Sequence, residues 1–356
     1  MSKRIAYCAD GTWDTSDKHT NVYKLYKSLT VSADQMPFYD DGVGATSLPV
    51  ERFVGGAFGT GLWQKIKDGY TKIAHVYEQD DPLYIFGFSR GAYTARSLAG
   101  MIAACGLPTK NFSDDLVETA FDAYRNKNNR AQILAKLKDC AMYSPKITMI
   151  GVWETVGALG IPSVLGGVDP VLYGFLDTGL HPCVLNAYHA LAIDERRFEF
   201  PATLWSSPPT PGQTIEQVWF CGVHSDVGGG EPDDVEGATA LSDISLGWMM
   251  GKASALGLQF DPAVQKTYTL PLDAKYALDK LHESWTPLWG FPRKRMIDKN
   301  AILADSVILR CQHDSSWRPE NLELSGGIPA NHYGIARVMS QIQTASGSAG
   351  EGKGGY

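Results

Sequence analysis

Residues 83–105 read LYIFGFSRGAYTARSLAGMIAAC, and this stretch decides the fold. Residues 83–88 are apolar without alternation, which is typical of a central parallel strand that is covered on both faces. Residues 92–104 are mostly small and apolar, which predicts a buried helix shortly after that strand. A strand that leads into a helix is the building unit of an α/β fold with a mostly parallel sheet.

The rest of the chain repeats this alternation of short apolar runs and helical patterns, which supports the same fold class. We expect one α/β domain over residues 1–345, with cap segments inserted at about 161–181 and 265–300 and a flexible tail over 346–356. Further strands are predicted over 4–9, 36–39, 147–153, 217–223 and 307–309, and further helices over 21–29 and 62–77, the latter after a Gly-rich loop over 55–61.

The composition is that of a globular protein from a reducing compartment. The chain has 356 residues, of which 44% are hydrophobic and 20% charged, and its net charge of −7 excludes binding to nucleic acid by charge alone. The six cysteines are scattered without zinc-like spacing, so we expect free thiols and neither a metal nor a cofactor. The N-terminus is too quickly polar for a signal peptide, and no apolar run approaches the roughly 20 residues of a membrane span. We therefore expect synthesis as a cytoplasmic protein.

Residues 87–91 form a G-x-S-x-G motif between the predicted strand and helix. In a turn this tight, Gly87 and Gly91 are required because a Cβ would collide with the strand or the helix. The turn lifts Ser89 above the carboxyl ends of the strands, which predicts a nucleophile; the alternative is an ordinary capping serine. The backbone N–H of Arg90, with one from Gly11 or Thr12 after the first strand, would form an oxyanion hole.

A serine nucleophile needs a base and an acid that orients the base. His224 follows the predicted strand 217–223, and Glu154 follows the strand 147–153, so both should lie on the same rim of the sheet as Ser89. The sequence therefore predicts a triad of Ser89, Glu154 and His224.

Asp226 is an alternative acid. If it orients the base, the base must come from a later segment, such as His313 or His332. The stretch around Asp226 also fits a tight turn whose carboxylate accepts backbone N–H bonds. A weaker alternative is that Asp226 converges on a cation with the aspartates Asp10, Asp40 and Asp41.

Five ordered motifs resemble one protein family. They resemble the bacterial and fungal α/β-hydrolase family once called a domain of unknown function, which includes the phospholipase effectors of type VI secretion with a Tle-type catalytic domain. The resemblance spans roughly residues 4–250 and implies an α/β-hydrolase fold. It also implies a Ser–Asp–His triad, which maps onto Ser89, Glu154 and His224 with Glu in place of the usual Asp. The motifs are DGTW (10–13), GFSRGAYTAR (87–96), GVWETVG (151–157), HALAIDERR (189–197) and HSDVGGG (224–230).

These features predict a serine ester hydrolase that acts on an acyl ester, best a lipid ester as in phospholipases and lipases. The apolar segment 161–181 and the Trp-rich loop 285–291 would line an acyl site or touch a membrane; the plain alternative is hydrophobic core. Arg96, Arg196 and Arg197 would bind an anionic head group or form structural ion pairs.

The resemblance implies a secretion-system or immunity protein as partner and export by a signal-independent secretion system. Two other functions remain open. One is a catalytically weak or inactive binding module associated with a secretion or toxin system. The other is a hydrolase for a peptide, a polyester or a small ester, because substrate choice lies in loops that the sequence does not resolve.

Overall fold

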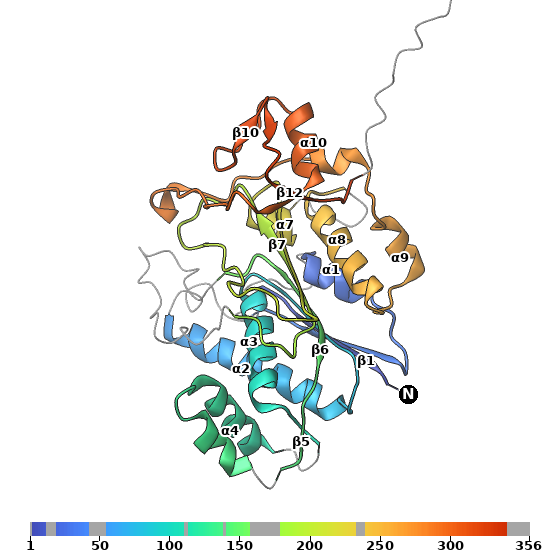
Figure 1. Ribbon diagram of the computed structural model, residues 1–356, viewed down its shortest axis with the longest axis vertical. Coiled ribbons are helices and arrows are strands. Elements are labelled where there is room, and N and C mark those ends of the chain that lie inside the picture. The colour runs from blue at the N-terminus through green and yellow to red at the C-terminus, as the bar shows by residue number, and fades with distance from the viewer. Residues whose placement is uncertain are drawn as a thin grey trace, which may run out of the picture.

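The computed structural model describes residues 2–11, 19–42, 55–109, 113–137, 140–156, 179–232 and 239–339. Its centre is an eight-stranded sheet in which each strand pairs in parallel with its neighbours (Figure 1). This confirms the predicted α/β architecture. In order across the sheet, the strands are β12 (Gly334–Ala336), β9 (Ile302–Ala304), β8 (Thr214–Phe220), β7 (Asn186–Ala192), β6 (Ile147–Trp153), β3 (Leu83–Phe88), β1 (Arg4–Ala9) and β2 (Gln35–Asp40).

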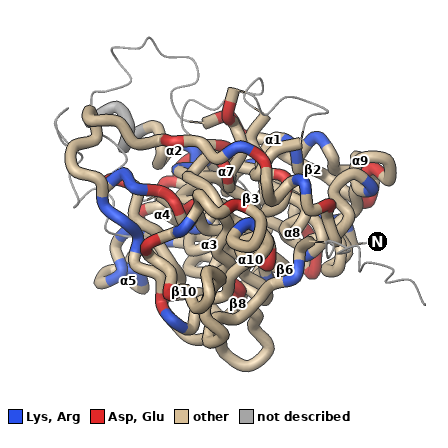
Figure 2. The backbone as a smooth tube through the Cα atoms, turned by 90° about the horizontal axis from the view of Figure 1, so that it is seen from above, with Lys and Arg blue, Asp and Glu red and all other residues tan. Residues whose placement is uncertain are grey.

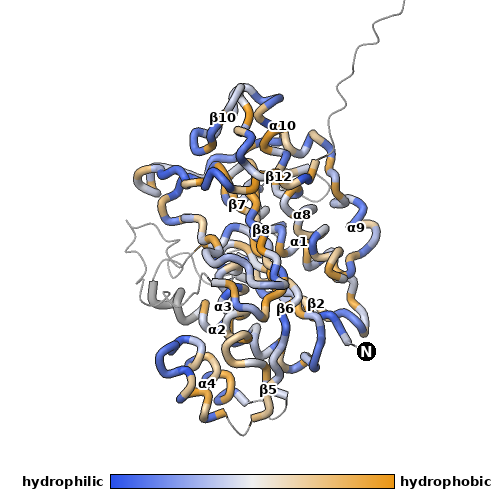
Figure 3. The backbone as a smooth tube through the Cα atoms, in the orientation of Figure 1, coloured by the Kyte–Doolittle hydropathy of each residue, from blue (hydrophilic) through white to orange (hydrophobic). Residues whose placement is uncertain are grey.

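Helices cover both faces of the sheet, as continuous apolar strands require. Alternate residues of β1 divide between the two layers: Ala6 and Cys8 pack with α1 (Asn21–Ser28) and α8 (Ser242–Ala255), whereas Ile5 and Tyr7 pack on the opposite layer. That layer consists of α2 (Gly55–Val76), α3 (Arg90–Cys105) and α4 (Asp114–Arg125). Figure 3 shows hydrophobic residues along the central strands.

The remaining elements are short. The helices are α5 (Arg130–Leu134), α7 (His224–Gly228), α9 (Pro262–Thr267) and α10 (Asp305–His313), and the 3-10 turns are η2 (Ala135–Leu137), η4 (Ala274–Leu278) and η5 (Pro287–Trp289). Two small antiparallel pairs join β4 (Leu107–Pro108) to β5 (Met142–Tyr143) and β10 (Leu324–Ser325) to β11 (Ile328–Pro329).

Three sequence predictions are wrong in detail, and one strand was missed. Residues 307–309 lie in helix α10, where Val307 and Leu309 face a buried layer. The predicted glycine-rich loop 55–61 is the beginning of helix α2. Strand β8 begins and ends three residues earlier than expected, since the turn after it starts at Cys221. Strand β7 was not predicted, although it lies between β6 and β8.

Two expected segments lie outside the described residues: most of the cap at 161–181 and the tail at 346–356. The second cap segment, 265–300, contains the end of α9, then η4 and η5, with extended chain between them. All six cysteines are free thiols. Within the described residues, no helix has the length and apolar character needed to cross a membrane. Figure 2 shows acidic and basic residues interspersed along the described backbone.

Candidate active site

The turn from β3 to α3 places Ser89 at the carboxyl edge of the sheet. Ser89 has φ 57° and ψ −119°, a conformation that non-glycine residues adopt only under constraint. The constraint comes from close packing: a Cβ on Gly87 would overlap the backbone of Gly91, and a Cβ on Gly91 would overlap the carbonyl oxygens of Ala9 and Asp10. The predicted need for glycine at both positions is thus visible in the structure.

Glu154 follows strand β6, the neighbour of β3. Phe88 and Trp153 are register partners, and the Ser89 N–H donates to the Trp153 carbonyl at 3.1 Å, so Ser89 and Glu154 leave adjacent strand ends. Glu154 has φ 49°, a second non-glycine residue in the left-handed region at this edge. The next residue is fixed too, because the Thr155 N–H donates to Nε2 of the buried His189 at 3.2 Å.

His224 begins helix α7 after strand β8, and its Nδ1 lies 3.0 Å from Glu154 Oε2. Both side chains are buried. Burial lowers the pKa of His224 and outweighs the hydrogen bond to Glu154, which acts in the opposite direction. The imidazole is therefore neutral at pH 7, the state that a general base requires.

Arg295 forms a bidentate ion pair with Glu154, an interaction that the sequence analysis missed. Its two terminal nitrogens lie 2.8 Å from Oε1 and Oε2, and they also donate to the carbonyl oxygens of Ala192 and Phe200 at 2.9 Å. The Ala192 N–H donates to Glu154 Oε1 at 2.7 Å. Burial alone would raise the pKa of Glu154, but Arg295 and His224 keep it well below its usual value. Glu154 is therefore a fixed, ionised carboxylate.

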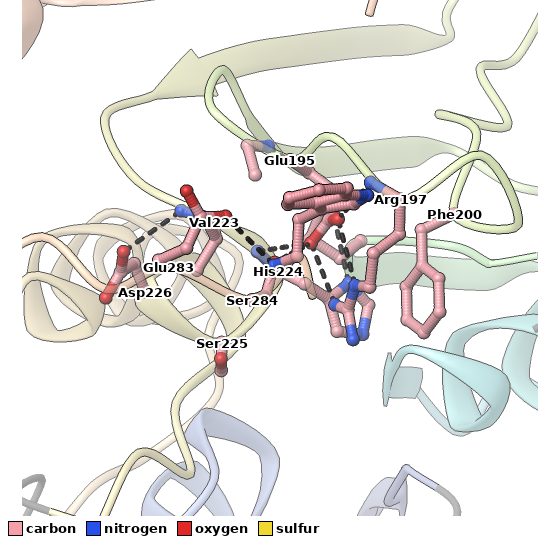
Figure 4. A network of polar contacts seen from close by, with 12 residues as sticks. Glu195, Arg197, Phe200, Val223, His224, Ser225, Asp226, Glu283 and Ser284 are labelled. Carbon is pink, nitrogen blue, oxygen red and sulfur yellow. Dashed lines mark hydrogen bonds and ion pairs between the residues drawn. The ribbon is translucent and has the colours of Figure 1, made fainter. Parts of the chain in front are cut away.

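Two further carboxylates fix the turn that carries His224; one of them, Glu195, is drawn with His224 in Figure 4. Glu195 accepts from the His224 N–H at 3.2 Å, and Asp194 accepts from the Gly222 N–H at 2.7 Å. Arg197 binds both oxygens of Glu195, at 2.9 and 2.8 Å. Burial would raise the pKa of Glu195, but Arg197 lowers it to about 2. Asp194, Glu195 and Arg197 belong to the motif at 189–197. The sequence alone assigned no role to Asp194 or Glu195.

Aromatic rings enclose the imidazole of His224. Phe88 is the residue before Ser89, and the centroid of its ring lies 4.7 Å from the centroid of the imidazole. The ring centroid of Phe200 lies 5.0 Å from the imidazole, and the two rings are nearly perpendicular. Trp289 contacts Phe200 in turn, with ring centroids 5.4 Å apart. The contact with Phe88 shows that the β3 turn and the β8 turn meet at the same place.

Asp226 pairs with a different histidine. Its Oδ1 lies 2.6 Å from His282 Nδ1, and its Oδ2 accepts from the Val223 N–H at 3.0 Å. The histidine that Asp226 contacts is thus His282, and not His313 or His332, the two later histidines that the sequence suggested. The carboxylate accepts backbone N–H bonds, as the turn interpretation predicted.

The loop after β1 gives a mixed result for the oxyanion candidates. The Gly11 N–H donates to Asp10 Oδ1 at 2.8 Å, so in this conformation it is engaged within the protein. Thr12 lies outside the described residues. Asp10 also accepts from Thr20 and Tyr39, and burial raises its pKa to about 6. Arg90 begins helix α3, whose N-terminal end lies next to Ser89.

Asp10, Asp40 and Asp41 line one small cavity, whereas Asp226 does not belong to it. Asp10 binds Thr20 and Tyr39, Asp40 binds Tyr7 and two lysines, and Asp226 binds His282. Within the described residues, no group of three or more His, Cys, Asp or Glu side chains has the arrangement of a metal site.

The three arginines considered for an anionic group have partners within the protein. Arg96 donates to the carbonyl oxygens of Thr203 and Leu204 and lies 4.8 Å over the ring of Trp205. Arg196 pairs with Glu283, and Arg197 with Glu195. The ion-pair interpretation of Arg196 and Arg197 is confirmed.

Comparison with known proteins shows similarity to a protein family, to a yeast protein and to a solved bacterial structure. The model of the catalytic domain of Tle1-like phospholipase effectors of type VI secretion matches residues 3–252. An uncharacterized protein of Saccharomyces cerevisiae, YEL023C, is 27% identical over 241 residues, and the match covers 58% of this chain and 33% of the yeast protein. A crystal structure of an uncharacterized protein from Pseudomonas aeruginosa matches with a TM-score of 0.46 and 18% identity, over 75% of this chain and 49% of that one.

The chain thus spans about a third of the yeast relative and half of the bacterial structure. The family match covers well over half of this chain and contains the β3 turn, the Glu154 strand end and the His224 turn. This chain therefore belongs to the family of Tle1-like phospholipase effector catalytic domains of type VI secretion.

Proposed function

We propose that this chain is a serine hydrolase that cleaves an acyl ester of a phospholipid, with Ser89 as nucleophile, His224 as base and Glu154 as acid. The observation that carries the proposal is the meeting of two features. Ser89 occupies a strained strand-to-helix turn, and the ring of its neighbour Phe88 packs on an imidazole whose Nδ1 contacts a buried, ionised carboxylate. A structural serine turn needs neither the imidazole nor the carboxylate.

The chemistry follows from the hydrogen bonds around His224. With Nδ1–H directed to Glu154, the other ring nitrogen, Nε2, is the acceptor for the Ser89 proton. Ser89 Oγ attacks the ester carbonyl, the proton passes to Nε2, and it is then returned to the departing alcohol. Water repeats the sequence on the acyl-enzyme, releasing the fatty acid and restoring the serine hydroxyl.

Charge on the carbonyl oxygen must be stabilised during attack. We assign one donor to the backbone N–H of Arg90, in the first turn of α3 directly after Ser89. The second donor comes from the loop after β1, either Thr12 or, after release from the Asp10 carboxylate, Gly11. Asp10 then acts as the residue that organises this loop.

A phospholipid is the substrate class that the family favours, and membership in it suggests export by a type VI system and an immunity protein as partner. The segments at about 161–181 and 265–300 would act as caps on a single catalytic domain. Arg295 supports the second cap, since it reaches Glu154 from within that segment.

The test is hydrolysis of a short-chain water-soluble ester and of a phospholipid by the wild type and by Ser89→Ala. We expect turnover to fall by about 10⁴ or more in the variant, with an unchanged circular dichroism spectrum. A fluorophosphonate should label the wild type and not the variant. Equal turnover by both proteins would refute the serine mechanism, and a well-folded wild type that neither reacts with the probe nor cleaves either ester would favour the binding-module alternative.

A further inference from the structure

The described surface carries one concentration of exposed apolar side chains. Seven large hydrophobic residues are exposed among the described residues, and four of them lie in the segments 196–198 and 285–296. Phe291 is 94% exposed, Met296 90%, Leu288 59% and Phe198 54%. We call these four side chains the apolar patch. Exposed apolar groups that gather in one place mark a site of interaction.

The two segments form one surface. The Arg293 N–H donates to the Arg196 carbonyl at 2.7 Å, and the Arg293 guanidinium lies 5.4 Å over the ring of Phe198. The orange segment around η5, which projects to the left in Figure 1, belongs to this surface. Its backbone is constrained: Pro287 begins η5, Gly290 has φ 71°, and Trp285 Nε1 donates to the Gly290 carbonyl at 3.2 Å. The local structure therefore presents the apolar side chains outward.

Cationic and aromatic groups border the patch. Of the three basic residues in 283–296, Arg293 and Lys294 are exposed, whereas Arg295 is buried and paired with Glu154. Arg196 lies 5.8 Å over Trp285, and Arg197 lies 5.1 Å over Trp289. Exposed apolar side chains beside Trp rings and the exposed Arg293 match the headgroup layer of a membrane, where rings and alkyl chains enter the boundary and guanidinium groups meet phosphates. We propose that the apolar patch docks on the headgroup layer of a phospholipid bilayer.

The patch lies close to His224, so docking would serve catalysis; this step rests on the proposed function. Trp289 contacts Phe200, and Phe200 contacts His224, so two ring contacts separate the rim of the patch from the imidazole. Arg295 lies next to Met296 in the chain and binds Glu154. Docking would therefore bring the membrane to the site that must receive a lipid ester, while the acid keeps its counter-ion.

The test measures binding and turnover separately. Vesicles of ether-linked phosphatidylcholine, with and without ether-linked phosphatidylglycerol, resist acyl hydrolysis and report binding by co-sedimentation. The variant L288S/F291S removes two exposed side chains that are not among the proposed catalytic groups. The matched control V31S/I335S removes two exposed apolar side chains from elsewhere, where Val31 is 77% and Ile335 42% exposed. Turnover of a water-soluble ester reports the integrity of the site.

We expect the wild type and V31S/I335S to bind vesicles with the same affinity. L288S/F291S should bind vesicles at least about tenfold more weakly, while its turnover of the soluble ester stays unchanged. Wild type that cleaves the soluble ester without binding vesicles would overturn the docking and leave the proposed function intact. Equal binding by L288S/F291S, an equal loss in the control, or a wild type that instead forms a dimer through the patch would also overturn it. A wild type that cleaves no ester at all would instead refute the proposed function.

Discussion

Replacing Arg295 by Met tests how much the ion pair with Glu154 contributes to the fold. The substitution keeps the approximate length of the side chain and removes its charge, which leaves the buried Glu154 carboxylate with only the Ala192 N–H and His224. Removing one partner of a buried ion pair costs about 3–5 kcal/mol. The carbonyl oxygens of Ala192 and Phe200 also lose a charged donor, which places the expected loss toward the upper end. Because domains are stable by only about 5–15 kcal/mol, this is a large fraction of the total.

The assay is urea denaturation followed by tryptophan fluorescence, with a double-mutant cycle through Glu154→Gln. We expect a coupling energy of about 1–3 kcal/mol, since the second substitution removes the charge that the first one leaves unpaired. The pKa of Glu154 is below its ordinary value in the folded state, so the pair stabilises the protein above about pH 4.5 and its contribution disappears as the pH falls further. The difference between wild type and Arg295→Met should therefore shrink in acid. Additive losses within about 0.5 kcal/mol, or a loss by Arg295→Met below about 1 kcal/mol, would refute the reasoning.

Three other predictions concern the site. Because burial lowers the pKa of His224, the acid limb of the pH profile of kcat/KM should have its midpoint below about 6.5, and a midpoint at or above pH 7 would contradict this. Glu154→Gln should lower ester turnover by about 10²–10⁴, whereas Asp226→Asn should stay within about tenfold of the wild type; the reverse ranking would make Asp226 the acid. Gly91→Ala should destabilise the fold by roughly 3 kcal/mol or more in denaturant titrations, because its Cβ would overlap the carbonyl oxygen of Ala9, and wild-type stability would show that the turn can relax.

Local signals account for what the sequence predicted well. Strand β3 and the turn at Ser89 follow from a continuous apolar run and from two glycines, which act within a few residues of each other. Strand β7 was not predicted because the polar residue His189 interrupts its apolar run. In the structure this side chain is buried, and burial lowers its pKa to about 3, so the imidazole is uncharged. The β-branched pair at 307–308 suggested a strand, but tertiary packing made it part of α10.

The electrostatic support of the site depends on contacts across long stretches of chain. Glu154 and Arg295 are 141 residues apart, and no spacing or periodicity in the sequence connects them. The roles of Asp194 and Glu195 also became visible only with the fold, although paired acids followed by two arginines at a strand end are a recognisable signal. His282 was missed as the partner of Asp226 for the same reason as Arg295.

Homology recognises residues 3–252 as a module, yet the counter-ion of Glu154 belongs to residue 295. A fragment cut at the homology boundary, or one grafted into another effector, would retain serine, imidazole and carboxylate but would bury an unneutralised negative charge. Fragments intended for expression or for chimeras should therefore extend past Arg295, and activity lost on shorter fragments would say nothing about the chemistry of the three residues themselves.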